Sequence, residues 1–91
     1  MNIRYTRRAA KQLDTILAYI GARSPQGAAH LVDRLDTALA IVTEQPHGGQ
    51  PTSRLGYRRL VLNPYPYVIF YRAASAEIVV HGIRHMARRP V

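Results

Sequence analysis

The order of apolar and polar positions divides the chain into a helical first half and a strand-rich second half. Between residues 7 and 44, apolar side chains recur every three or four positions, which is the spacing of one buried helical face. From residue 57 onward, apolar residues form short runs separated by turn-forming residues, which is typical of strands. The pattern therefore predicts two helices followed by a small sheet.

The first half predicts a short strand and two helices. Residues 2–5 can form a strand, and a helix is expected over about residues 7–22, after a threonine that can cap it. Ser24 and Pro25 suit the cap and the first position of a second helix, which should end near Glu44. Because the connection between the helices is very short, they should run antiparallel as a hairpin.

The second half predicts a loop and three strands. Residues 46–56 are rich in glycine, proline and polar residues, which indicates a loop. Strands are expected at residues 57–62, 67–72 and 77–84, and their short connections predict an antiparallel meander. We therefore expect residues 1–91 to form one α+β domain. It combines an N-terminal strand, an antiparallel helical hairpin packed on one face of a mainly antiparallel sheet, and a C-terminal three-stranded meander that completes the sheet.

The segment PYPYVIFYR, residues 64–72, is apolar on both faces of the strand it should form. Successive side chains of a strand point to opposite faces, so Ile69 and Tyr71 should lie on one face. Val68 and Phe70 should lie on the other. Since a two-helix hairpin covers only one face of the sheet, we expect an apolar second face that a partner covers. The alternative is that long arginine stems lie over that face.

Positive charge is the strongest feature of the composition. The formal net charge is +8, and residues 54–91 contribute +6 of it through seven arginines and one glutamate. Lys11 is the only lysine, so most of the charge is carried by arginine, whose planar fork matches carboxylate and phosphate groups. The charge indicates either an anionic partner, such as nucleic acid or an acidic protein, or a solvated basic surface.

The composition also argues against several classes of protein. The chain has no cysteine, which excludes disulfides and thiolate zinc sites and fits a reducing compartment. No apolar run approaches the roughly 18–20 residues of a membrane span, and the first residues lead into no signal-peptide core. No glycine-rich phosphate loop is present. We expect a cytoplasmic protein that has no cofactor and does not bind a membrane.

Arginines on the expected strands are the main candidates for binding chemistry. The first strand of the meander carries Arg58 and Arg59. Arg72 and Arg84 lie on the two strands that follow, so these arginines could gather on the sheet or at its rim. Such a cluster could hold phosphate or carboxylate through charge-assisted hydrogen bonds. The alternative is a set of solvated strand-end charges that discourage edge pairing.

The histidines of the last strand offer weaker chemistry. By simple alternation, Arg84 should share a face with Ile78 and Val80. His81 and His85 should lie on the other face, about 13 Å apart at 3.3 Å per residue, which is too far to share one metal ion. No metal site is therefore expected. Either histidine could carry protons in RNA cleavage, although a strand histidine is more often a packed structural group.

Three segments have a familiar order: YRRLVL at residues 57–62, YPYVIFYR at 65–72 and IVVHGIRHMARRP at 78–90. Preceded by a strand and a helical hairpin, they resemble the RelE/ParE toxin superfamily of bacterial toxin–antitoxin systems. The resemblance spans essentially the whole chain. It implies a toxin that inhibits growth and is neutralised by a cognate antitoxin.

The superfamily has two branches with different targets. RelE-like members cut mRNA in the ribosomal A site, using basic residues on the sheet and usually a tyrosine close to the C-terminus. This sequence has no lysine beyond Lys11 and no tyrosine beyond Tyr71, which favours the ParE-like branch, whose members act on DNA gyrase without nuclease activity. A ribosome-dependent endoribonuclease is the alternative. Its catalytic residues would be Arg59, Arg72, Arg84 and His85.

The resemblance implies DNA gyrase as the target and a ParD-like antitoxin with an acidic C-terminal segment as the partner. The antitoxin is expected to lie across the second face of the sheet, as a helix in a groove or as an added strand. The residues expected to contact the antitoxin or the target are Arg58, Arg59, Tyr67, Ile69, Tyr71, Arg72, Arg84, Arg88 and Arg89.

Overall fold

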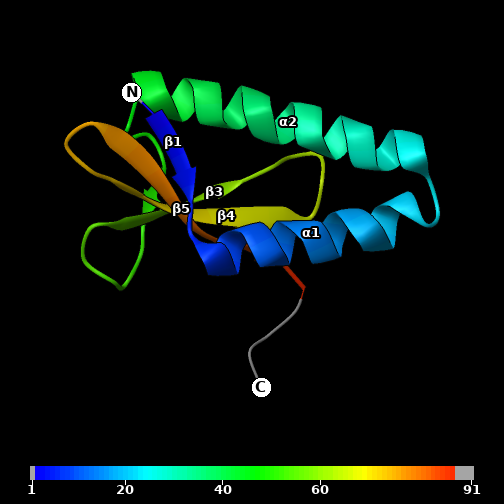
Figure 1. The fold of residues 1–91 in the computed structure, drawn as a ribbon. Helices are drawn as coiled ribbons and strands as arrows, with labels where there is room; N and C mark the ends of the chain where they lie inside the picture. The colour runs from blue at the N-terminus through cyan, green and yellow to red at the C-terminus, as the bar shows by residue number, and fades with distance from the viewer. Residues whose placement is uncertain (1, 88–91) are drawn as a thin grey trace.

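The computed structural model describes residues 2–87, and Figure 1 shows a pair of helices beside a sheet. The elements follow the order expected from the sequence, with one additional short strand after the second helix. They are β1 (Asn2–Tyr5), α1 (Arg7–Gly21), α2 (Pro25–Glu44), β2 (Gln50–Pro51), β3 (Tyr57–Val61), β4 (Tyr67–Ala73) and β5 (Glu77–His85).

The strands form one five-stranded sheet in the order β1-β5-β4-β3-β2. Neighbours from β2 to β5 are antiparallel, and β1 pairs with β5 in parallel. The predicted α+β fold with a mainly antiparallel sheet is thus confirmed. The difference is β2, which lies within the expected loop of residues 46–56. It has two residues, one of them proline, so neither its length nor its composition indicates a strand.

Both helices begin at capped N-termini, as the sequence predicts. The Thr6 hydroxyl accepts a hydrogen bond from the Ala9 amide at 3.1 Å, and the Ser24 hydroxyl accepts one from the Gly27 amide at 3.0 Å. Pro25 lies in the first turn of α2, where its missing N–H removes no helical hydrogen bond. The short connection then turns the chain back, so that α1 and α2 form an antiparallel hairpin (Figure 1).

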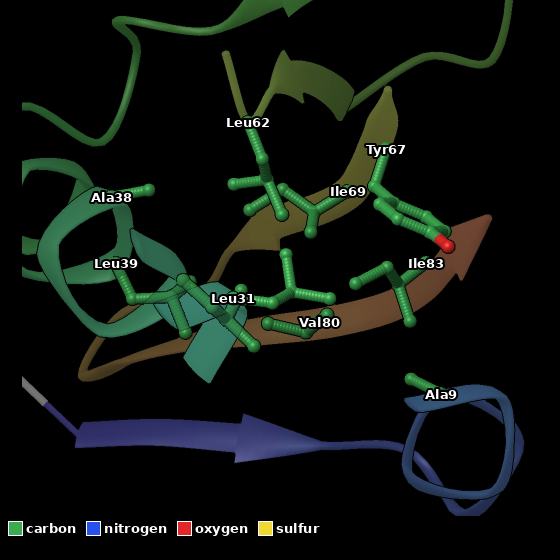
Figure 2. Packing of buried hydrophobic residues seen from close by; sticks show 10 residues of the cluster. Ala9, Leu31, Ala38, Leu39, Leu62, Tyr67, Ile69, Val80 and Ile83 are labelled. Carbon is green, nitrogen blue, oxygen red and sulfur yellow. The ribbon is translucent and has the colours of Figure 1, made fainter. Parts of the chain in front are cut away.

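The hairpin covers one face of the sheet, and the core lies between the two layers. Figure 2 shows side chains of α2 pointing toward those of β4 and β5. Removal of this apolar surface from water is the main force that holds the hairpin on the sheet. The buried side chains of this core include Leu31, Leu35, Ala38, Leu39, Leu62, Ile69, Val80 and Ile83.

The helix side of β4 carries Tyr67, Ile69 and Tyr71, and all three are buried. The expectation that Ile69 and Tyr71 meet a partner is therefore wrong, because the same chain covers them completely, whereas Tyr67 keeps 8% of its surface exposed. The Tyr71 hydroxyl accepts a hydrogen bond from the Gly49 amide at 2.9 Å and donates one to the Pro46 carbonyl at 3.1 Å. A Cβ on Gly49 would lie 2.6 Å from that hydroxyl, so this approach requires glycine. Tyr71 thus fastens the loop after α2 to the core.

A β-bulge in β5 changes which side chains share a face. Phe70 pairs with Gly82, but the next residue of β4 pairs with Val80, so His81 is an extra residue in β5. Beyond the bulge, the alternation is displaced by one position. Arg84 therefore lies on the face away from the helices, and the expectation that it shares a face with Val80 is wrong.

Candidate functional site

The sheet face away from the helices is rich in arginine and aromatic side chains, and we call it the basic face. The guanidinium carbon of Arg84 lies 4.8 Å from the centroid of the Phe70 ring, and that of Arg54 lies 4.1 Å from the Tyr57 ring. Both are cation–π contacts, which hold the charges against the sheet. By strand register, the basic face includes Tyr57, Arg59, Val61, Val68, Phe70, Arg72, Val79, His81, Gly82 and Arg84.

The apolar groups of the basic face are covered by the chain itself. Val68 is 3% exposed and Val79 is 1% exposed. The loop between β2 and β3 passes beside Phe70: Thr52 and Ser53 line two clefts, and Phe70 lines both of them as well. The expectation of a bare apolar face is therefore wrong. The alternative, in which arginine stems cover the face, is closer to the structure, with the loop as a second cover.

The larger of these clefts has a volume of about 480 Å³ and gathers three of the four residues expected for the endoribonuclease alternative. Arg59, Arg84 and His85 line it together with Thr52 and Ser53. Two guanidinium groups beside two hydroxyls can hold a phosphate or a carboxylate through charge-assisted hydrogen bonds. We call this the arginine cleft.

The other predicted arginines lie elsewhere. Arg58 is paired with Tyr71 and donates a hydrogen bond to the Gly49 carbonyl at 2.8 Å, so it supports the loop after α2. Arg72 lies on the basic face opposite Tyr57 and is not among the residues that line the arginine cleft. The two remaining predicted contacts, at positions 88 and 89, lie outside the described residues.

The surroundings of His81 on the basic face lower its pKa and so favour the neutral ring. Burial lowers the pKa of His81 from its ordinary value of 6.5, and the charges of Arg72 and Arg54 lower it further. Its ring packs edge-on against Tyr57, with 4.7 Å between the centroids. Among residues 2–87, neither its Nε2 atom nor the Nε atom of Arg59 has a hydrogen-bond partner, although both are buried. The positive charge of the basic face is therefore carried by its arginines, which suits an anionic ligand.

An apolar groove of about 730 Å³ lies between α1 and the ends of β4 and β5. Ile16 forms part of the helix side, and Tyr67 and Ile83 form part of the sheet side. The Ile83 amide donates a hydrogen bond to the Gln12 side-chain carbonyl at 3.0 Å, which holds α1 beside β5. The other residues that line the groove are Arg8, Lys11, Thr15, Tyr19, Arg84, His85 and Ala87.

The apolar groove carries charge of one sign. Arg8, Lys11 and Arg84 line it, and none of its lining residues is Asp or Glu. Tyr19, which is 55% exposed, lies under the guanidinium carbon of Arg23 at 3.9 Å. An acidic segment with apolar side chains would therefore find both kinds of contact here.

Sequence reasoning missed this groove, because it treated α1 only as a cover for the sheet. A signal was present, since Arg8, Lys11, Thr15 and Tyr19 recur every three or four positions and so share one side of the helix. That signal shows a common helix face. It does not show that the end of β5 lies beside it.

Within residues 2–87, no helix combines the length and the apolar character needed to cross a membrane. Over the same residues, His, Cys, Asp and Glu side chains form no group of three that could hold a metal ion.

Several known proteins are similar to this chain. Residues 3–90 match the family described as the ParE toxin of the type II toxin–antitoxin system parDE. Y4kP of Sinorhizobium fredii, whose name gives it as a candidate toxin, is 40% identical over 83 residues, which cover 91% of this chain and 85% of that protein. Toxin RelE2 of Caulobacter vibrioides is 41% identical over 85 residues, which cover 92% of this chain and 93% of that protein.

A solved structure supports the same relation at the level of the fold. One chain from the chromosomal ParDE toxin–antitoxin system of P. aeruginosa matches with a TM-score of 0.78 and 25% sequence identity. The match covers 93% of this chain and 95% of that chain.

Proposed function

The chain belongs to the ParE toxin family of type II toxin–antitoxin systems, and we propose that it acts by inhibiting DNA gyrase without enzymatic activity of its own. The observation that carries the proposal is the match of residues 3–90, nearly the full length, to the ParE family. The sequence supports a non-enzymatic action, because it has no lysine beyond Lys11 and no tyrosine beyond Tyr71. These are the residue types that RelE-like nucleases use.

A supercoiling assay with purified gyrase tests this proposal. Relaxed plasmid is incubated with gyrase, ATP and increasing amounts of the purified chain. We expect supercoiling to stop once the chain saturates the enzyme. Full supercoiling at saturating chain would contradict gyrase inhibition.

Membership of the family implies a cognate antitoxin, and we propose that an acidic segment of this antitoxin binds in the apolar groove. Three features support the groove: its volume of about 730 Å³, its apolar wall at Ile16 and Ile83, and its positive charge without a lining carboxylate. Complementary charge accelerates encounter, while burial of apolar side chains slows dissociation. The association rate of the antitoxin should therefore fall as the salt concentration rises, while its dissociation rate changes less.

Two substitutions at equally exposed positions test the groove. Tyr19 lines it and is 55% exposed, whereas Ile41 on α2 is 54% exposed and does not line it. We expect Tyr19→Asp to weaken antitoxin binding at least about tenfold, because it removes an aromatic contact and adds a like charge. Ile41→Asp is the matched control and should bind as the wild type does. Equal affinities for the two variants would exclude the groove as the antitoxin site.

The arginine cleft supports a second candidate, a ribosome-dependent endoribonuclease. It gathers Arg59, Arg84 and His85, which are three of the four residues that such an activity would use. Arginines can stabilise the charge that develops on a phosphate, and a histidine can move a proton. In vitro translation followed by primer extension separates the candidates. Cleavage within codons at the ribosomal A site would support the nuclease, and intact mRNA would support the gyrase inhibitor.

A further inference from the structure

The most exposed large apolar side chain of residues 2–87 is Leu55, in the turn between β2 and β3. It is 98% exposed, and the next such side chain, Tyr19, is 55% exposed. Apolar burial stabilises a fold in proportion to the area removed from water, so the Leu55 side chain adds almost nothing to the stability of this chain. Single exposed apolar residues are common and need no explanation. A role for Leu55 therefore needs a further observation, which the backbone around it supplies.

The turn holds Leu55 on a backbone that is hydrogen-bonded on both sides. The Thr52 amide donates to the Tyr57 carbonyl and the Tyr57 amide donates to the Arg54 carbonyl, each at 3.1 Å. The Thr52 hydroxyl accepts from the Arg54 amide at 3.1 Å. Gly56 has φ of +83°, which lets the chain reverse directly after Leu55.

None of these hydrogen bonds involves the Leu55 side chain. The Arg54 guanidinium also packs against the Tyr57 ring, so the residues on each side of the tip brace each other. A side chain on a pre-ordered backbone loses less entropy when it binds than one on a mobile loop. The turn therefore has the properties of a preorganised apolar anchor.

The position and charge of the turn indicate what it could meet. Leu55 is not among the residues that line the apolar groove, and in Figure 1 the turn between β2 and β3 lies on the other side of the sheet from α2. A projecting tip needs a concave surface, which a folded protein offers and a short bound segment does not. Arg54 directly precedes the tip, so the concave surface should carry acidic groups around an apolar pocket.

We propose that Leu55 is an anchor that inserts into an apolar, acid-rimmed pocket of the protein that the toxin inhibits. This anchor is separate from the apolar groove that receives the antitoxin. The proposal deepens the proposed function, since the target used to test it is gyrase. It assigns the antitoxin and the target to different surfaces of one small domain.

The test compares Leu55→Asp, Leu55→Ala and the control Ile41→Asp. Binding to immobilised purified gyrase is measured for each, together with binding to the antitoxin and the melting temperature. We expect Leu55→Asp to weaken gyrase binding at least about tenfold, with Leu55→Ala between it and the wild type. Ile41→Asp should bind gyrase normally. All three variants should keep the melting temperature and the antitoxin affinity of the wild type.

In the binding experiment, two results would overturn the anchor. One is wild-type gyrase binding by Leu55→Asp, and the other is an equal loss of gyrase and antitoxin binding, which would indicate general damage. If the wild type itself does not bind gyrase, the proposed target is wrong, and growth arrest in cells that lack the antitoxin tests the anchor independently. Relief of arrest by Leu55→Asp but not by Ile41→Asp then supports an anchor for another target. Equal arrest by all variants overturns it, and a wild type that arrests no growth overturns both proposals.

Discussion

The two faces of β4 have similar composition but different roles in the molecule. The helix side carries Ile69 and Tyr71, which the hairpin and the loop after α2 bury completely. The basic face carries Val68 and Phe70, which arginine side chains and the loop between β2 and β3 cover instead. An apolar side chain in a strand therefore does not by itself mark the core. Here one apolar face of the strand is covered by the helical hairpin, and the other is covered by arginine side chains and a loop.

The sharpest test of this comparison places a charge on each face of β4. We expect Ile69→Asp to lower the free energy of unfolding by more than about 4 kcal/mol and to leave the domain unfolded, because a carboxylate would be buried without a partner. We expect Phe70→Asp to cost about 1 kcal/mol, because the side chain is only half-buried and packs under Arg84. Circular dichroism during thermal unfolding measures both. Similar losses for the two variants would contradict the assignment of the faces.

A smaller effect is expected where the helix side of β4 holds the loop after α2. Tyr71→Phe removes the hydroxyl that bridges the Gly49 amide and the Pro46 carbonyl, and leaves both groups short of a partner. The expected cost is about 1–3 kcal/mol. Urea unfolding measures this cost. Tyr65→Phe, at a half-buried tyrosine, is the control and should cost less, and an equal loss would show that the bridge adds no stability.

The smallest effect is a pH dependence that arises on the basic face. The pKa of His81 in the folded chain lies below its ordinary value of 6.5, so folding favours the neutral ring. Its contribution is therefore present above about pH 6.5 and is lost as the pH falls through the lowered pKa of the folded chain. We expect His81→Gln to lose less stability than the wild type between neutral and mildly acidic pH.

Melting temperatures measured at a series of pH values give this difference, with His47→Gln as the control at an exposed loop position. If wild type and His81→Gln show the same dependence on pH, the arginines do not act on His81 as inferred.

The sequence predicts most of the fold but only part of the candidate site, for physical reasons. Helical periodicity and the caps at Thr6 and Ser24 are local features, so both helices could be placed before the structure was known. The core side of β4 could not be predicted, since this strand is apolar on both faces and no polar side distinguishes the surface from the core. The bulge at His81 moved Arg84 to the other face, and the sequence analysis did not use the signal beside it, which is the isolated glycine Gly82 within a strand.

The groove and the arginine cleft depend on tertiary placement. The groove exists because α1 lies beside the end of β5, and the cleft exists because the loop at Thr52 and Ser53 passes beside Phe70. The sequence places Arg59 and Arg84 on neighbouring strands of the meander. It does not reveal that Arg58 points to the helix side, where it bonds the Gly49 carbonyl.

Methyl NMR spectra of the chain with and without its antitoxin test the central claim most directly. According to this claim, the antitoxin binds beside the core, in the apolar groove, and the second face of β4 is already closed. We expect the methyl signals of Ile16 and Ile83 to shift when the antitoxin is added, because both side chains line the groove. The signals of Val68 and Val79 should stay in place. Shifts at Val68 and Val79 with unchanged signals at Ile16 and Ile83 would contradict the account.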